Sequence, residues 1–303
     1  MSEGNFELNN RQILVRAIAP DTQTIASTDT CPQATAPRIQ LWDISQHSFS
    51  LVSELEDTHG EVTKIAFSAD SQTIAIGNFQ GTITLREVKT GRLIQTLDGG
   101  SCINDIAFSL NGQYLLSATD YAGTRLWNLK SGEQIKCFSG FRGWTYAVAF
   151  SRDGKFAAAG DDYGCIQIRR LSDGMLLNTF NHSYCLGFLA FSYHDQIIAS
   201  ANKIDGTIKL WWWREEKEPI PLCLEHGNRD ISAIAFHPHK LILASAATDG
   251  TAILWDIENQ STLLNYQHPG SVNVLQFSLD GSQLFTCCTV GIVKIWDLYF
   301  FLF

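Results

Sequence analysis

A repeat of about 42 residues is the feature that most constrains how this chain can fold. Six units contain a Phe at the end of a short apolar run. The six such residues are Phe67, Phe108, Phe150, Phe191, Phe236 and Phe277, at intervals of 41, 42, 41, 45 and 41 residues. A later marker follows each of them, namely Arg86, Trp127, Arg169, Trp211, Trp255 and Trp296. An earlier, divergent unit carries Trp42, so the sequence contains seven units.

Within one unit the pattern predicts short strands joined by tight turns. In residues 148–171, an apolar strand meets Asp153-Gly154, and both turn residues tolerate positive φ. Two further strands and a second turn at Asp173-Gly174 lead to a fourth strand. Such a four-stranded antiparallel sheet is apolar on both faces. It becomes stable when copies stack around an axis, which predicts an all-β ring.

The third strands of three units end in Trp-Asp, in the segments QLWD (40–43), ILWD (253–256) and KIWD (294–297). With the repeat length, these motifs make the chain resemble the WD-repeat family over essentially its whole length. The resemblance implies an all-β, seven-bladed β-propeller with four-stranded antiparallel blades, forming a single domain over 1–303. The expected units are 11–56, 57–98, 99–139, 140–181, 182–225, 226–267 and 268–303, with residues 5–9 completing the last blade.

The family resemblance also implies a hydrogen-bond network of His, Ser or Thr, Asp and Trp within a blade. The sixth unit offers His226, Asp249 and Trp255, with Ala247 where the hydroxyl is expected. The fifth offers His182, Asp205 and Trp211, again without a clear hydroxyl. We therefore expect no unit to have the complete network.

The second and fourth units have Arg where the family has Trp. In the fourth unit Arg169 takes this position, and Asp161 stands where the network hydroxyl would be. Because a buried charge needs a partner, we expect Asp161 and Arg169 to form an ion pair.

Charge and composition argue against nucleic-acid-binding and membrane proteins. The net charge is −9 and the basic residues are scattered, so nucleic acid is a poor partner. The N-terminus is polar and the apolar stretches are strand-sized, which predicts a soluble cytoplasmic chain without a membrane segment. Eight dispersed Cys are expected to be reduced. We expect a monomer or a member of a larger complex.

Motifs for catalysis are missing from the sequence. It has no nucleophile motif and no glycine-rich phosphate loop. His237 and His239 lie in a turn without a third metal ligand, so no metal or cofactor is predicted. The innermost strands of the six units that follow the first carry only Lys64 and Asp105 as charged residues. The alternative is a propeller enzyme or small-ligand sensor acting at the mouth of the central channel.

A binding surface is predicted from topology. In an up-and-down blade, the loop before the first strand and the loop after the second lie at one end, which we call the top face. Aromatic and Arg side chains concentrate in these loops, and they dominate binding hot spots. The predicted partner-binding residues are Phe79, Tyr121, Phe141, Arg142, Trp144, Tyr163, Tyr184 and Arg229.

These residues predict a scaffold or adaptor that binds a protein or peptide. Arg142 adds a planar donor, so an acidic or mixed partner segment would suit the surface. The alternative is that some of these rings are buried between blades. An insertion at residues 31–37 is either a recognition loop or a variation in loop length.

Overall fold

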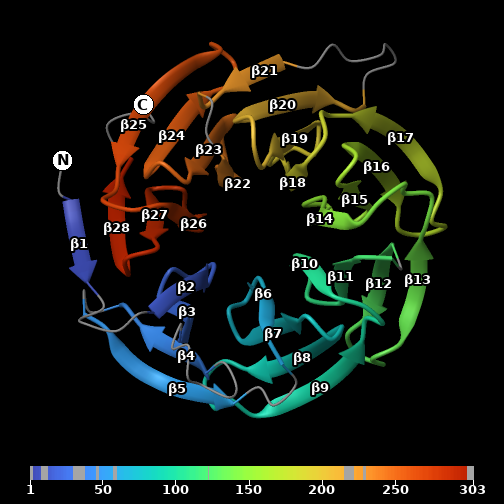
Figure 1. The fold of residues 1–303 in the computed structure, drawn as a ribbon, viewed down its shortest axis with the longest axis horizontal. Helices are drawn as coiled ribbons and strands as arrows, with labels where there is room; N and C mark the ends of the chain where they lie inside the picture. Colours follow the sequence, from blue (N-terminus) through green and yellow to red (C-terminus); the bar gives the residue numbers. More distant parts are fainter. Residues whose placement is uncertain are drawn as a thin grey trace.

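The computed structural model describes residues 3–7, 13–29, 38–45, 48–56, 60–121, 123–214, 222–227 and 230–298. In these ranges the regular secondary structure consists of strands, with no helix. The strands form seven four-stranded antiparallel sheets arranged as blades around a central channel (Figure 1). The predicted fold, a seven-bladed β-propeller, is confirmed.

The four strands of each blade follow one another from the central channel outward. The first four blades, innermost strand first, are β2 (Ile13–Ile18), β3 (Thr24–Asp29), β4 (Arg38–Asp43), β5 (Ser50–Glu56); β6 (Val62–Phe67), β7 (Thr73–Asn78), β8 (Thr82–Glu87), β9 (Leu93–Asp98); β10 (Ile103–Phe108), β11 (Tyr114–Thr119), β12 (Thr124–Asn128), β13 (Gln134–Phe138); and β14 (Thr145–Phe150), β15 (Phe156–Asp161), β16 (Cys165–Arg170), β17 (Leu176–Asn181). The last three are β18 (Leu186–Phe191), β19 (Ile197–Asn202), β20 (Thr207–Trp212), β21 (Leu222–Glu225); β22 (Ile231–Phe236), β23 (Ile242–Ala247), β24 (Thr251–Asp256), β25 (Ser261–Gln267); and β26 (Val272–Phe277), β27 (Gln283–Cys288), β28 (Ile292–Asp297), β1 (Glu3–Glu7).

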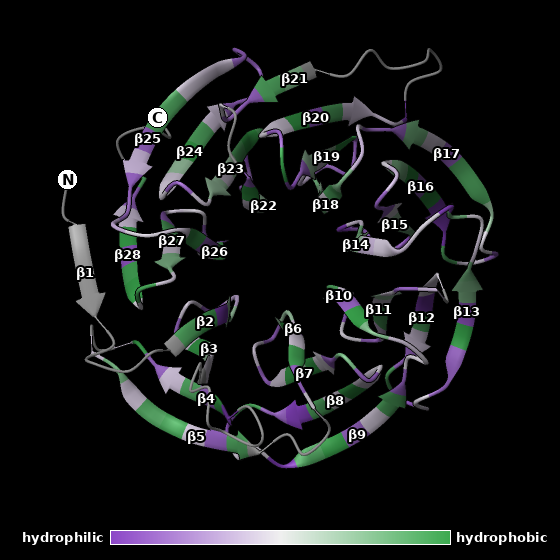
Figure 2. Ribbon diagram, in the orientation of Figure 1, coloured by the Kyte–Doolittle hydropathy of each residue, from purple (hydrophilic) through white to green (hydrophobic). Residues whose placement is uncertain are grey.

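The hydrophobic core is divided among the junctions between blades. Seven clusters of buried residues are present, and each joins two neighbouring blades. Between the fourth and fifth blades, for example, Ile166 and Ile168 pack with Leu186 and Ile198, all of them essentially inaccessible to solvent. Burying one such side chain contributes roughly 1.5–3 kcal/mol. The stacking of apolar strand faces therefore stabilises the ring (Figure 2).

Strands from the two ends of the described chain meet in the seventh blade. β1 pairs antiparallel with β28, in a register that runs from Glu3 opposite Trp296 to Glu7 opposite Ile292. The strand predicted at 5–9 therefore begins two residues earlier than expected. Residues 299–303, which follow β28, lie outside the described residues.

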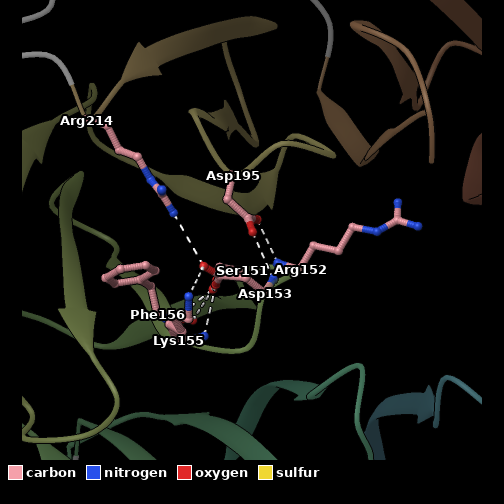
Figure 3. Close-up of polar contacts among 7 residues, drawn as sticks. All are labelled: Ser151, Arg152, Asp153, Lys155, Phe156, Asp195 and Arg214. Atoms are coloured by element: carbon pink, nitrogen blue, oxygen red, sulfur yellow. Dashed lines mark hydrogen bonds and ion pairs between the residues drawn. The ribbon is translucent and has the colours of Figure 1, made fainter.

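The first hairpin turns hold neighbouring blades together at the end opposite the top face. Asp195 has a φ of +56°, at the position that is Gly154 in the fourth blade. Its carboxylate accepts hydrogen bonds from the backbone N–H groups of Arg152 (2.6 Å) and Asp153 (2.8 Å) (Figure 3). Arg214 lies 3.6 Å from the Asp153 carboxylate. These contacts connect the fourth and fifth blades through charged side chains as well as through packing.

Candidate functional site

The hydrogen-bond network expected to be incomplete is complete in the sixth blade. His226 Nδ1 lies 2.7 Å from Ser245 Oγ, which also accepts the indole N–H of Trp255 at 2.8 Å. His226 Nε2 lies 2.7 Å from Thr251 Oγ1, which donates to Asp249. The prediction that no unit has the full network is therefore wrong.

The error lies in the position of the hydroxyl. It was expected at Ala247, but Ser245 stands two residues earlier on the same face of β23. Trp255 pairs with Leu243 across the ladder, so its indole reaches Ser245 diagonally.

The fifth blade has the same arrangement. Ser200 Oγ lies 2.7 Å from His182 Nδ1 and accepts the Trp211 indole N–H at 2.8 Å. His182 Nε2 lies 3.1 Å from Thr207 Oγ1, which donates to Asp205. These five residues form a second complete network.

Related pairs occur in three other blades. The indole N–H groups of Trp42, Trp127 and Trp296 donate to Ser27, Ser117 and Thr286, at 2.9, 3.0 and 2.7 Å. In the seventh blade His268 Nε2 also contacts Thr286, at 2.7 Å. Burial lowers the pKa of His182, His226 and His268 to about 4. These histidines are consequently neutral structural groups at pH 7.

The ion pair predicted between Asp161 and Arg169 is not formed. The guanidinium of Arg169 donates to Gln167 Oε1 (2.7 Å) and to the carbonyl oxygen of Ser139 (2.9 Å). Asp161 is fully buried and accepts hydrogen bonds from the backbone N–H groups of Arg142 (2.9 Å) and Cys165 (2.8 Å). The two side chains therefore have separate partners.

Asp161 and Arg169 do not pair because Asp161 is not at the position of the network hydroxyl. In the ladder between β15 and β16, Arg169 pairs with Ala157, so Ala159 is the residue equivalent to Ser245. Asp161 lies at the top end of β15, beyond the network position.

The top of the channel is shaped by a bulge near the start of each innermost strand. In all seven blades the pairing of the first two strands shifts by one residue there. The bulged residues are Arg16, Thr63, Asn104, Tyr146, Gly187, Ser232 and Asn273. Bulges re-aim side chains. Asn104, for example, donates to the carbonyl oxygen of Thr145 in the next blade at 2.9 Å.

The bulged positions of the fourth and fifth blades, Tyr146 and Gly187, take part in a different contact. At Gly187 the stem of Lys203 fills the space that a Cβ would occupy. The Lys203 ammonium lies 4.1 Å from the centre of the Tyr146 ring, which is a cation–π contact. Burial lowers the pKa of Lys203. This corner of the channel rim thus consists of an aromatic ring capped by a partly buried cation.

Deeper in the channel is a cavity of about 340 Å³. The two charged residues predicted for the inner strands, Lys64 and Asp105, form an ion pair at 2.8 Å. Asp105 also accepts the backbone N–H of Val148 at 2.9 Å. Arg16 is a third charged residue of the lining, which the sequence pattern did not reveal because it belongs to the divergent first unit.

Four of the predicted aromatic residues gather on the top face of the third to fifth blades. Tyr121, Trp144, Tyr163 and Tyr184 have exposed fractions of 82, 37, 54 and 58%. We call these four residues the aromatic patch.

The rings of the aromatic patch form two edge-on pairs. The ring centres of Tyr121 and Trp144 are 5.8 Å apart, and those of Tyr163 and Tyr184 are 5.3 Å apart. Gly143 connects the pairs, since a Cβ there would overlap with Asp162 and approach Tyr163 at 2.6 Å. The chain before Trp144 therefore lies directly against the loop that carries Tyr163.

The other predicted binding residues do not join the aromatic patch. Phe79 is exposed on the second blade. Phe141 is half-buried and packs against the core cluster between the third and fourth blades. The side chain of Arg142 is exposed, and its charge acts on Cys165, the first residue of β16. Arg229 and the 31–37 insertion lie outside the described residues.

Two further residues of this face, Tyr146 and Asp162, were not predicted from the sequence. Tyr146 belongs to an inner strand rather than a loop, but the bulge turns its ring toward Trp144, with ring centres 6.3 Å apart. Asp162 follows β15, and its Oδ1 atom is buried without a hydrogen-bond partner among the described residues. The adjacent acids Asp161-Asp162 were the available signal for this site.

The two histidines of the turn after β22 are engaged within the protein. His237 Nε2 lies 3.0 Å from the carbonyl oxygen of Gly281, and His237 Nδ1 accepts the backbone N–H of His239 at 3.0 Å. Among the described residues no group of three or more His, Cys, Asp or Glu is placed to hold a metal. No helix in the described ranges has the length and apolarity needed to cross a membrane.

Seven four-stranded blades, five of them with a Trp–Ser or Trp–Thr hydrogen bond, define a repeat β-propeller. The family model described as WD domain, G-beta repeat matches residues 91–128, 132–168, 174–211, 218–256 and 260–297. The chain belongs to this family. The matched segments begin after β8, so the structure adds the first blade and most of the second to what the family model recognises.

Curated proteins similar to this chain include the human angio-associated migratory cell protein. It is 24% identical over 313 residues, covering 98% of this chain and 70% of that protein. The SIR4-interacting protein SIF2 of Saccharomyces cerevisiae is 25% identical, covering 84% of this chain and 50% of its own length. The rice small ribosomal subunit protein RACK1y is 26% identical, covering 44% of this chain and 41% of its own length.

Proposed function

We propose that this chain is a non-catalytic scaffold or adaptor that binds protein or peptide partners through its top face. The observation that carries the proposal is the aromatic patch, four exposed rings from three blades gathered at one end of the ring. Large rigid rings supply contact area at low entropic cost. A cytoplasmic location is part of the same proposal.

The relatives support this general role. WD-repeat propellers are generally protein-interaction scaffolds. SIF2 is described as interacting with SIR4, and the Schizosaccharomyces pombe relative wat1 as a subunit of the target of rapamycin complex. What we propose for this chain is the feature that these relatives share, association with other proteins. We propose none of their particular partners for it.

The channel supports a structural role better than a catalytic one. Lys64 and Asp105 are bonded to each other, and Asp105 also connects to the fourth blade through Val148. A general acid or base needs a free position facing a substrate. The mutual pairing of these two residues favours their use in holding blades together.

The test compares the two ends of the ring. Partners captured by the wild-type chain are quantified against Trp144→Ala and Tyr121→Ala at the top. Leu110→Ala and Leu279→Ala serve as matched controls, since both leucines are exposed in turns at the opposite end. We expect the top variants to weaken capture by about 2 kcal/mol and the controls to retain it. Loss of capture only in the two leucine variants would contradict the proposal. Circular dichroism verifies folding.

A further inference from the structure

Asp162 lies beside the aromatic patch and has no cationic partner among the described residues. Its Oδ1 atom is buried and accepts no hydrogen bond from a described residue. No ion pair joins its carboxylate to any Lys, Arg or His in the described ranges. Burial, and then repulsion from Asp161, raises the pKa of this carboxyl group. A partly desolvated and unpaired carboxylate is costly, and a nearby cation would offset that cost.

Aromatic residues adjoin this carboxylate. Its backbone N–H donates to the carbonyl oxygen of Trp144 at 3.0 Å, and Tyr163 is the next residue. The Asp162 charge contributes, after burial and Asp120, to the raised pKa of Tyr146. It also contributes, after Tyr163 and burial, to the raised pKa of Tyr184. Gly143 packs against both the Asp162 carboxylate and the Tyr163 ring. Ring faces attract cations, so the rings and the carboxylate favour the same kind of ligand.

Acidic side chains outnumber basic ones in the described loops of the top face. Carboxylates that are exposed or half-buried there belong to Asp98, Asp120, Asp205, Asp230 and Asp249. The two described cations of these loops do not form an ion pair with Asp162. The ammonium group of Lys203 lies over the Tyr146 ring, and the side chain of Arg142 is exposed. The acidic or mixed partner suggested by Arg142 is thus disfavoured by the charges around the rings.

We propose that the aromatic patch binds a basic peptide segment of a partner protein, with a Lys or Arg side chain paired to Asp162 among the rings of Trp144, Tyr163 and Tyr184. This inference rests on the proposed function, because it names the chemistry of the partner for the same face. The partner cation gives Asp162 the ion pair that it lacks among the described residues. The rings cover the aliphatic stem of that side chain and exclude water.

The test uses four pools of short peptides with random flanks and a fixed central Arg, Lys, Leu or Glu. The full chain is immobilised, and retention of each pool is measured at low salt, where charge effects are largest. We expect the Arg and Lys pools to be retained at least about fivefold more than the Glu pool. Asp162→Asn lowers their retention to that of the Leu pool. Asp173→Asn removes an exposed carboxylate in the turn between β16 and β17 and leaves the preference intact.

Any other outcome of the peptide experiment counts against the inference. Equal retention of all pools, retention of none, or an unchanged Arg preference in Asp162→Asn would overturn it. If a Glu or Leu pool is preferred and Trp144→Ala weakens it, the top face binds peptides but the charge assignment fails. The melting temperature separates binding from folding. Because Asp162→Asn keeps the shape of the side chain and removes a partly buried charge whose pKa is raised by burial, it should melt at or slightly above the wild-type temperature.

Discussion

The indole nitrogen of Trp255 donates a hydrogen bond to Ser245 Oγ at 2.8 Å, and His226 contacts the same oxygen at 2.7 Å. One buried hydroxyl group on β23 thus contacts the indole ring of β24 and the imidazole ring of the loop before β22. The same relationship joins Trp211, Ser200 and His182 in the fifth blade. These networks connect the second and third strands of a blade to the top-face loop before its first strand.

Removal of the shared hydroxyl should be costly. Ser245→Ala leaves a buried indole N–H and an imidazole nitrogen without partners, so we expect unfolding free energy to fall by about 2–4 kcal/mol. Equilibrium urea denaturation measures the change. Ser261→Ala, at the exposed start of β25, is the control and should stay near wild type. Equal stability of Ser245→Ala and the wild type would show that the network does not stabilise the blade.

Stability should decrease as the pH falls below about 6.5. Burial lowers the pKa of His182, His226 and His268 to about 4, from 6.5 for an ordinary His. The unfolded chain therefore binds protons before the folded chain does. The stability that these residues provide is complete above about pH 6.5 and is lost as the pH approaches 4. The loss reaches about 3 kcal/mol for each histidine.

Unfolding free energies measured between pH 6.5 and 5 test this prediction. The slope should be shallower in His226→Gln, which has one fewer of these groups. Ser261→Ala changes an exposed residue that does not titrate and should keep the wild-type slope. A wild-type chain whose stability is flat over this interval would refute the prediction.

Asp161 and Arg169 should differ in their importance for folding. Asp161→Ala leaves two buried N–H groups, of Arg142 and Cys165, without an acceptor, and should cost about 2–4 kcal/mol. Arg169→Met should cost about 1 kcal/mol, because water can replace the half-exposed guanidinium at its partners. Urea denaturation of both variants, beside Asp173→Ala as an exposed carboxylate control, gives the ranking. The reverse order would mean that Asp161 is not the acceptor on which this loop depends.

Removal of the N-terminal strand should open the ring. Without residues 1–10, β28 becomes an edge strand with unpaired backbone groups. We expect a lower melting temperature and self-association in size-exclusion chromatography. A synthetic peptide of residues 1–10 added in trans should restore part of the lost stability. An unchanged melting temperature in the truncated chain would show that β1 does not stabilise the seventh blade.

The repeat made the fold predictable from the sequence. Marker residues such as Phe150 and Trp255 recur at regular intervals, and turn pairs such as Asp153-Gly154 separate the strands. Together they indicate the same local structure in each blade. The limits of a strand are less visible. β1 begins two residues before its predicted start because an alternating pattern alone does not fix its register against β28.

Side-chain partners were less predictable than strands. The role of Ser245 is hidden in the sequence because the network crosses the ladder diagonally, and that relationship depends on the register of β23 with β24. The predicted pairing of Asp161 with Arg169 failed for the same reason. Tyr146 escaped prediction because a bulge, rather than a loop, brings it to the top face. By contrast, Tyr121, Trp144, Tyr163 and Tyr184 were predicted to share one face because topology alone determines which loops lie at the same end.

The central claim is that partners bind the top face, and site-specific photo-crosslinking tests it most directly. A benzophenone amino acid is placed at Tyr121 or Tyr184 in the aromatic patch, and at Leu110 or Leu279 at the opposite end. Each chain is irradiated with its captured partner. We predict covalent adducts from positions 121 and 184 and none from positions 110 and 279. Adducts from 110 and 279 alone would place the partner at the other end of the ring and contradict the account.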